Sequence, residues 1–403
     1  MKNKLLDSLH LKSFLSFGPE SRPVPLTNLN VLIGPNGVGK SNFIEAVEPL
    51  HATPADFSGA IRIGGTPNDW IWLGGTEATA AHVEAELSPV RFTPLLRYAI
   101  EFSQIGERLE IVDEVLEESR RADPRAKDVR FYYRFQRGNP AINVRKAIGS
   151  KSAHPPYRRR KLQRESIDPQ QSIFSQRKDP DLYPEVTMAG KRFGAIQVFR
   201  EWSFGRSAAL RIAQPPNLPN DVLLPQLVNL GLVINRLEHG STWPRFNEMM
   251  QKFLPRYKWI STKVSAGSVQ VYLHEDGLNV PVPATRLSDG TLRFVALLAI
   301  LLNAESTPLI CIEEPELGLH PDAMSLMAEL LIEAAEKTQL IVTTHSDALV
   351  SALTEHAESV LVCDYLENGT EMQRLDAEQL TFWLEKYRLG EIWRLGKLGG
   401  NLW

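Results

Sequence analysis

A glycine-rich stretch near the N-terminus has the residue types and spacing that hold phosphate groups. Residues 34–41 read GPNGVGKS, the pattern of Gly, four residues, Gly, Lys and then Ser or Thr. The glycines allow the backbone to turn with its N–H groups pointing inward, toward an anion. Lys40 would reach the terminal phosphates of a nucleotide, and the Ser41 hydroxyl would bind Mg²⁺. The predicted nucleotide contacts are Asn36, Gly37, Gly39, Lys40, Ser41 and Asn42.

Two adjacent carboxylates suggest chemistry on such a nucleotide. Glu313 and Glu314 follow an apolar run and precede Pro315. We predict that Glu313 holds Mg²⁺, directly or through water, and that Glu314 orients or deprotonates the attacking water. An acidic strand end exposed to solvent is the alternative interpretation. The phosphate loop upstream favours the catalytic one.

Two more polar groups precede helices. Ser288 and Gly290 begin a long apolar helix, where free backbone N–H groups and the helix dipole favour an anion. Taken alone, this pattern is more typical of an ordinary helix cap. His345 follows an apolar strand, the position at which open α/β sheets bind ligands. For His345 we therefore prefer a contact with the γ-phosphate to a purely structural role.

Short apolar segments must position these groups. Residues 29–33 are predicted to form a buried strand before the phosphate loop, and residues 41–50 the helix after it. Residues 308–312 and 339–343 are predicted to form two more buried strands, which end at the carboxylates and before the histidine. The partly alternating pattern of residues 83–116 predicts antiparallel strands.

The composition is that of an ordinary soluble protein of two lobes. The chain has 403 residues, 43% of them hydrophobic, and a formal net charge of −3. No apolar run is long enough to cross a bilayer, and the N-terminus lacks a signal-peptide core, so we expect a cytoplasmic protein. Cys311 and Cys363 lie in apolar runs, which predicts packed thiols and no zinc site.

The middle of the chain is basic. Residues 120–206 contain about 21 Lys and Arg against about 8 Asp and Glu. The densest point is YRRRKLQR, residues 157–164, for which we predict an exposed, mobile loop on an inserted subdomain. A solvated positive loop and a nucleic-acid contact are equally good interpretations. The residues that would make such contacts are Arg158, Arg159, Arg160 and Lys161.

The order of the four motifs resembles the ABC superfamily, specifically the heads of SMC, RecF and overcoming-lysogenization-defect ATPases. The pattern IEEPELGLHP, residues 312–321, and the final LGGNLW resemble stand-alone bacterial ATPases of this type. The resemblance implies that Glu314 is the catalytic glutamate, that Glu313 is the acid of the second nucleotide motif and that His345 is the switch histidine. It also implies that Ser288 and Gly290 form a signature that grips ATP bound to a second subunit.

The chain departs from the family pattern in two respects. Glu313 stands where many relatives carry Asp, and its longer side chain favours metal binding through water. The metal-binding glutamine that lies between the lobes of such ATPases has no clear counterpart, and Gln104 is only a weak candidate. The resemblance further implies that residues 316–322 form a loop that crosses the dimer interface.

These expectations combine into an α/β fold, an ABC-type ATPase head. Its parts are an N-terminal lobe with the phosphate loop (1–115), a basic and helical insertion (116–264) and a C-terminal lobe with signature, acids and histidine (265–403). The short middle lacks the heptads of a coiled-coil arm, and fewer than about sixty residues follow His345, too few for a nuclease domain.

For function, we expect Mg²⁺-dependent ATP hydrolysis by a homodimer that acts as a sensor or scaffold and controls an effector protein, in anti-phage defence. The alternative is an ATP-dependent clamp on double-stranded DNA in repair or maintenance. We expect no membrane partner. A transporter subunit, a kinase and a GTPase fit the motifs less well.

Overall fold

The computed structural model describes residues 4–75, 79–90, 93–121, 128–136, 138–145, 157–265 and 267–399. A six-stranded sheet lies at its centre, in the order β10-β14-β15-β3-β16-β17. The pairs from β10 to β16 are parallel, and β17 pairs antiparallel with β16. The parallel strands therefore place their carboxyl ends at one edge. The strands are β10 (Gln197–Phe199), β14 (Leu309–Glu313), β15 (Gln339–Thr343), β3 (Leu29–Ile33), β16 (Val360–Leu366) and β17 (Gly369–Arg374).

Both faces of this sheet are covered, which explains why its strands are continuous apolar runs. Val31 and Ile33 face a core formed with α8, α9 and α10, whereas Leu32 faces a second core formed with the helices after the phosphate loop. The helices on the first face are α8 (Asp289–Leu301), α9 (Met324–Ala335) and α10 (Asp347–Ala352). On the second face lie α1 (Lys40–Glu45) and α2 (Val47–Ala52). The helices α3 (Phe57–Ile63), α4 (Ile173–Gln176) and α5 (Pro184–Gly194) continue this second core away from the six-stranded sheet.

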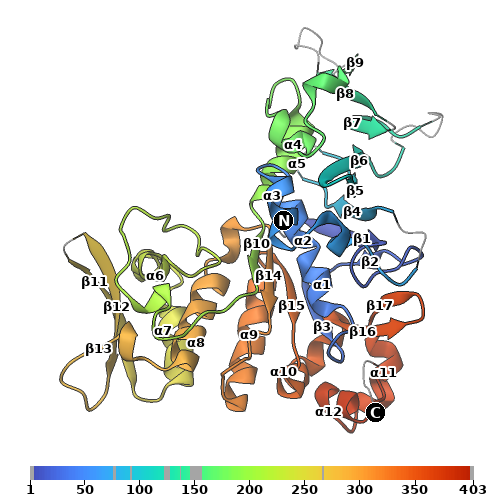
Figure 1. Ribbon diagram of the computed structural model, residues 1–403. Helices are drawn as coiled ribbons and strands as arrows, with labels where there is room; N and C mark the ends of the chain where they lie inside the picture. Colours follow the sequence, from blue (N-terminus) through green and yellow to red (C-terminus); the bar gives the residue numbers. More distant parts are fainter. Residues whose placement is uncertain are drawn as a thin grey trace, which may run out of the picture.

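An eight-stranded antiparallel sheet extends this second core, as Figure 1 shows, in the order β2-β1-β4-β5-β6-β7-β8-β9. In β4 every second residue is buried, and β4, β5 and β6 pair antiparallel, so the prediction for residues 83–116 is confirmed. The sheet continues past residue 115. Its strands are β1 (Leu6–Lys12), β2 (Val24–Pro25), β4 (Ala81–Leu87), β5 (Leu96–Ile105), β6 (Arg108–Glu118), β7 (Phe131–Gln136), β8 (Asn139–Arg145) and β9 (Tyr157–Lys161).

The basic segment is not the loop that its composition predicts. Residues 157–161 form β9, the outermost strand of the sheet, which pairs with β8. The prediction of exposure is confirmed, since the four basic residues of β9 are exposed. An edge strand beyond the covering helices buries few side chains and needs no alternating apolar residues, so its sequence carries no strand signal. Residues 146–156 lie outside the described part of the chain.

A three-stranded sheet leads into the signature helix. It comprises β11 (Tyr257–Ser265), β12 (Ser268–Glu275) and β13 (Val282–Pro283), and it lies at the left in Figure 1. The helices α6 (Leu230–Glu238) and α7 (Trp243–Phe253) pack against it, while α11 (Ala377–Leu384) and α12 (Leu389–Arg394) lie near the C-terminus. Cys311 and Cys363 are buried free thiols, as predicted. None of the described helices is both long and apolar enough to cross a membrane.

Candidate active site

The phosphate loop follows β3 directly and leads into α1. Gly34, Gly37 and Gly39 have φ angles of 146°, 81° and 98°, which L-residues with side chains rarely adopt. At Gly39 the crowding is also steric, because a Cβ atom there would lie 2.2 Å from Thr370 Oγ1 and 2.4 Å from Ser16 Oγ. The glycines of the motif are therefore required by the shape of the turn.

Lys40 points into this turn. Its Nζ donates hydrogen bonds to Gly34 O at 2.8 Å and to Pro35 O at 2.7 Å, and the residue is buried. Burial lowers the pKa of Lys40, and the carboxylates of Glu314 and Glu313 oppose this effect. An ammonium held inside a ring of backbone groups fits a phosphate anion, which would take the place of the two carbonyl contacts.

The other residues predicted to contact the nucleotide surround this ammonium. Asn36 and Gly37, at the tip of the loop, are exposed, and so is Ser41 in the first turn of α1. Asn42 is half-buried. The loop is therefore open to a ligand from outside.

Glu313 ends β14, and its carboxylate is engaged by an arginine that the sequence did not indicate. Arg200 directly follows β10, and the pairing of Phe199 with Ile312 brings it beside Glu313. Arg200 Nε lies 3.0 Å from Glu313 Oε2, and its two terminal nitrogens each lie 3.3 Å from a carboxylate oxygen of Glu45 or Glu48. The only sequence signal was a pair of apolar residues, Val198 and Phe199, before an arginine.

The oxygens near the loop fit Mg²⁺. A hydroxyl on Ser41 and a carboxylate on Glu313 are the hard ligands that this ion prefers. The ion pair with Arg200 uses Oε2 of Glu313, and among the described residues no arginine contacts Oε1. Three carboxylates around one guanidinium also leave net negative charge beside the phosphate loop.

Glu314 has an unusual backbone. Its φ angle is 46°, in the left-handed region, and its N–H donates to Thr343 O at 3.1 Å. A non-glycine residue in this conformation costs on the order of 1–3 kcal/mol and persists only where its surroundings enforce it, typically at functional sites. Its carboxylate Oε1 lies 3.4 Å from His345 Nε2. The structure thus brings together two side chains that are 31 positions apart in the sequence.

His345 lies just beyond β15. Its N–H donates to Glu316 Oε1 at 2.8 Å, and the Thr344 hydroxyl donates to the same oxygen at 2.6 Å. Burial lowers the pKa of His345, and the positive charge of Lys40 lowers it further. Glu314 and Glu316 oppose this shift, whose direction favours the neutral imidazole, a form with one N–H to donate to an anion.

The predicted signature begins α8. The Ser288 hydroxyl accepts a hydrogen bond from Thr291 N–H at 3.1 Å, so within one chain Ser288 is an N-cap. A Cβ atom on Gly290 would lie 2.8 Å from Gly318 O, which shows how closely the signature approaches the loop of residues 316–322. Ser288 and Gly318 are both exposed.

A buried arginine fixes the turn before the signature. Arg211 Nη1 donates to Leu287 O at 2.6 Å and to Ala284 O at 3.1 Å, and Nη2 pairs with the Asp289 carboxylate. Its Nε donates to Phe204 O at 2.7 Å. No motif marks Arg211 in the sequence, because its partners in the turn before the signature lie more than seventy positions away.

Two predicted features lie apart from this site. The Gln104 amide donates to Gly106 O at 3.0 Å, in the turn between β5 and β6, and none of its described hydrogen bonds reaches the phosphate loop. The basic strand β9 forms the far edge of the eight-stranded sheet. Residues 400–403 of the final LGGNLW lie outside the described part of the chain.

Known proteins resemble this chain in sequence. Residues 29–351 match the family described as "AAA domain, putative AbiEii toxin, Type IV TA system". The Old nuclease of Escherichia phage P2 is 30% identical over 126 residues, which cover 28% of this chain and 21% of the nuclease. The energy-coupling factor transporter ATP-binding protein EcfA2 of Mycoplasmoides gallisepticum is 28% identical over 165 residues, 38% of this chain and 50% of that protein. The chain thus spans half or less of each of these relatives.

Solved structures share the fold. An SMC head bound to the C-terminal winged-helix domain of ScpA superposes with a TM-score of 0.58 at 14% identity, over 93% of this chain and 99% of that one. An SMC head with an extended coiled coil, bound to the C-terminal domain of ScpA derived from Pyrococcus furiosus, gives 0.56 at 13% identity, over 95% and 99%. The family match spans most of the chain, and the fold agrees with it. The chain therefore belongs to this AAA family and is an ATPase with the fold of an SMC head.

Proposed function

We propose that two copies of this chain close around ATP and that the nucleotide state of this homodimer controls an effector protein. This proposal rests on the exposure of the signature serine. Ser288 is exposed, and the loop that approaches Gly290 carries Leu317, an apolar side chain that is 51% exposed. Among the described residues, no hydrogen bond or ion pair joins Ser288 or Gly290 to residues 34–42 of the same chain. A second copy can bring its own signature to the open phosphate loop.

In this proposal each residue of the site has one task. Lys40 and the backbone N–H groups of the loop bind the phosphates, and Ser41 and Glu313 hold the metal ion, which neutralises charge on the phosphates when it is bound. Glu314 accepts a proton from the attacking water. His345, whose Nε2 lies 3.4 Å from Glu314 Oε1, donates a hydrogen bond to the γ-phosphate and senses its loss.

The effector role is supported by the relatives. The family description names a toxin and a type IV toxin–antitoxin system, and one relative is a phage-encoded nuclease. Both suggest that ATPases of this kind govern a damaging activity, which is useful in anti-phage defence inside the cytoplasm. This support is by analogy at the level of the family, and it comes to this chain as a proposal.

Replacing Ser288 with Arg tests the shared site. We expect Ser288→Arg to bind ATP like the wild type, because its own phosphate loop is unchanged, but to lose hydrolysis, because the large cation blocks the loop of the other copy. A mixture with Lys40→Ala protein should regain activity. Random pairing would give one intact site in half of the dimers, about a quarter of the wild-type rate. The measurements are ATP binding by calorimetry and phosphate release.

An outcome without any regained activity would contradict the shared site, provided that the two variants form mixed dimers in a pull-down with two different tags. Ser288→Ala serves as the control, since it removes the cap hydroxyl without adding bulk. Its cost to stability should be about 1 kcal/mol, the usual value for a lost N-cap.

Strand β9 favours a second candidate function, an ATP-dependent clamp on double-stranded DNA. Arg158, Arg159, Arg160 and Lys161 are exposed on an edge strand. The Arg159 guanidinium lies 5.5 Å from the ring centre of Phe131, so an aromatic ring lies beside one of these cations. Because side chains alternate along a strand, two of the four charges point to each face. Each face therefore offers only two of these cations to a phosphate backbone.

The response to DNA separates the two functions. If the chain controls an effector protein, we expect the ATP hydrolysis rate to be the same with and without a duplex, at low and at moderate salt. Stimulation that fades with salt and disappears in the Arg158→Gln, Arg159→Gln, Arg160→Gln variant would support the clamp instead, because phosphate contacts release counterions. The matched control makes the same charge change elsewhere, with Gln at Arg256, which directly precedes β11, and at Lys258 and Lys263 on β11.

A further inference from the structure

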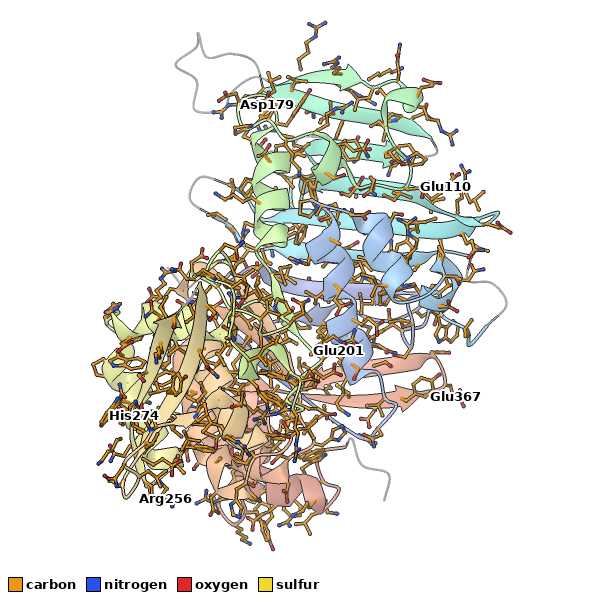
Figure 2. The ribbon with its side chains drawn as sticks, turned by 60° about the vertical axis from the view of Figure 1, so that its left-hand side comes forward. Glu110, Asp179, Glu201, Arg256, His274 and Glu367 are labelled. Atoms are coloured by element: carbon orange, nitrogen blue, oxygen red, sulfur yellow. The ribbon has the colours of Figure 1, made fainter. Side chains whose placement is uncertain are left out.

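One segment of the chain contacts both halves of the site. Residues 199–211, here called the bridging segment, run from the end of β10 to Arg211. Arg200 binds Glu313, while Arg211 binds the turn before the signature. Figure 2 shows Glu201 of this segment between Glu110 of the eight-stranded sheet and His274 of the three-stranded sheet. The bridging segment therefore lies where the catalytic glutamates and the signature helix meet.

Arg293 of the signature helix is held by two rings of this segment. Its guanidinium carbon lies 5.0 Å from the ring centre of Trp202 and 4.8 Å from that of Phe204. The planes of these two rings differ by only 11°, with centres 5.9 Å apart. Arg293 itself is buried. Contact with two aromatic faces leaves a desolvated guanidinium little freedom to move.

The same arginine reaches the backbone of the catalytic turn. Arg293 Nη1 donates to Glu314 O at 3.2 Å, and Trp202 Nε1 donates to the preceding carbonyl, Glu313 O, at 2.9 Å. The carbonyl groups of two neighbouring residues are thus hydrogen-bonded to Arg293 and Trp202, two side chains that contact each other. The strained φ of 46° at Glu314 lies between them. A strained backbone persists only where its surroundings enforce it, and here Arg293 supplies part of that restraint from another element.

We propose that Arg293 is a positioning residue through which the signature helix sets the orientation of Glu314. This inference rests on the catalytic role proposed for Glu314. A shift of α8 changes the contact with Glu314 O and moves the carboxylate relative to the attacking water. Ser288 caps the same helix, and in the proposed dimer it faces the nucleotide of the second copy. Binding of that nucleotide would therefore affect the chain's own catalytic base through two residues, Ser288 and Arg293.

A packing role alone does not account for an arginine here. Burying a guanidinium is costly unless hydrogen bonds and charges compensate, and an apolar side chain would fill the space beside the two rings at lower cost. Burial indeed lowers the pKa of Arg293, although Glu316, Asp289 and Glu314 oppose this. The energetic cost of burying Arg293 is consistent with a function for its hydrogen bond to Glu314 O.

The test compares Arg293→Met, which keeps length but loses donors and charge, with Arg293→Lys, which keeps charge but not the planar group. For Arg293→Met we expect kcat to fall by about tenfold to a hundredfold, because a small misplacement of a catalytic group costs that much, with ATP affinity within about twofold of wild type. Arg293→Lys should retain an intermediate rate. Arg245→Met is the matched control, since Arg245 pairs with three carboxylates on α7 and α9 away from the site.

A double variant separates positioning from packing. If Arg293 acts through Glu314, then adding Arg293→Met to Glu314→Gln should not slow the residual hydrolysis further. If the two substitutions reduce the hydrolysis rate independently, so that their effects multiply, the inference is overturned. An unchanged kcat in Arg293→Met would overturn it as well. Should Arg293→Met fail to fold, Arg293→Lys takes its place, and a kcat equal to that of the wild type would overturn the inference. If Glu314→Gln alone leaves hydrolysis intact, the catalytic assignment of Glu314 fails, and this inference fails with it for a distinguishable reason.

Discussion

Replacement of Glu314 with Gln is expected to slow ATP hydrolysis by about 10²–10⁴-fold, the usual contribution of a general base. Gln keeps the size of the side chain and its hydrogen-bonding oxygen, but it cannot accept the proton of the attacking water. ATP binding should remain, because the proposed phosphate contacts come from Lys40 and the loop backbone and are unchanged in this variant. Single-turnover hydrolysis and calorimetric binding of ATP measure the two effects separately.

The same variant tests the dimer. With ATP bound and not cleaved, the two copies should remain closed, so light scattering should report twice the mass of one chain only when Mg²⁺ and ATP are present. A variant that stays a monomer under these conditions would contradict the shared site, unless the protein is an oligomer already without nucleotide. Glu367→Gln is the matched control, because Glu367 is an exposed glutamate in the turn after β16, as Figure 2 shows.

The local motifs of this site could be predicted from the sequence because each fits within one strand and the turn after it. The phosphate loop needs glycines at fixed spacing, and Glu314 and His345 each follow a run of buried strand residues. The α/β fold class could be predicted from the same buried apolar strands. These features depend on backbone geometry and burial, which act over a few residues.

The residues that hold the site together could not be predicted in this way. Arg200, Arg211 and Arg293 bind partners that are 113, 76 and 21 positions away, and the pairings depend on the order of strands in the sheet. A single arginine in a sequence is normally a solvated surface residue, so nothing distinguishes a buried one before the topology is known. Strand β9 was missed for a related reason, since its exposed side chains give no apolar pattern.

Lys40 is expected to be the residue whose loss affects ATP binding most. Its ammonium is buried among backbone carbonyls at 2.7–2.8 Å, and a bound nucleotide would replace these with phosphate oxygens. A charge-assisted hydrogen bond is worth about 1.5–3 kcal/mol, so the loss of two such bonds in Lys40→Ala should weaken ATP binding by about 10²–10⁴-fold. Isothermal titration of ATP with Mg²⁺ measures this directly.

The fold should tolerate this change, which makes the result interpretable. Lys40→Ala removes a partly desolvated charge, and its carbonyl partners lie at an open loop where water can replace it. We therefore expect the melting temperature without nucleotide to change little, whereas the rise in melting temperature on adding ATP, present in the wild type, should disappear. Lys191→Ala, at an exposed position on α5, should keep that rise. Normal ATP affinity in Lys40→Ala would contradict the assignment of the phosphate loop. The proposed coupling of Glu314 to the signature helix would then fail too, because it requires ATP bound at this loop.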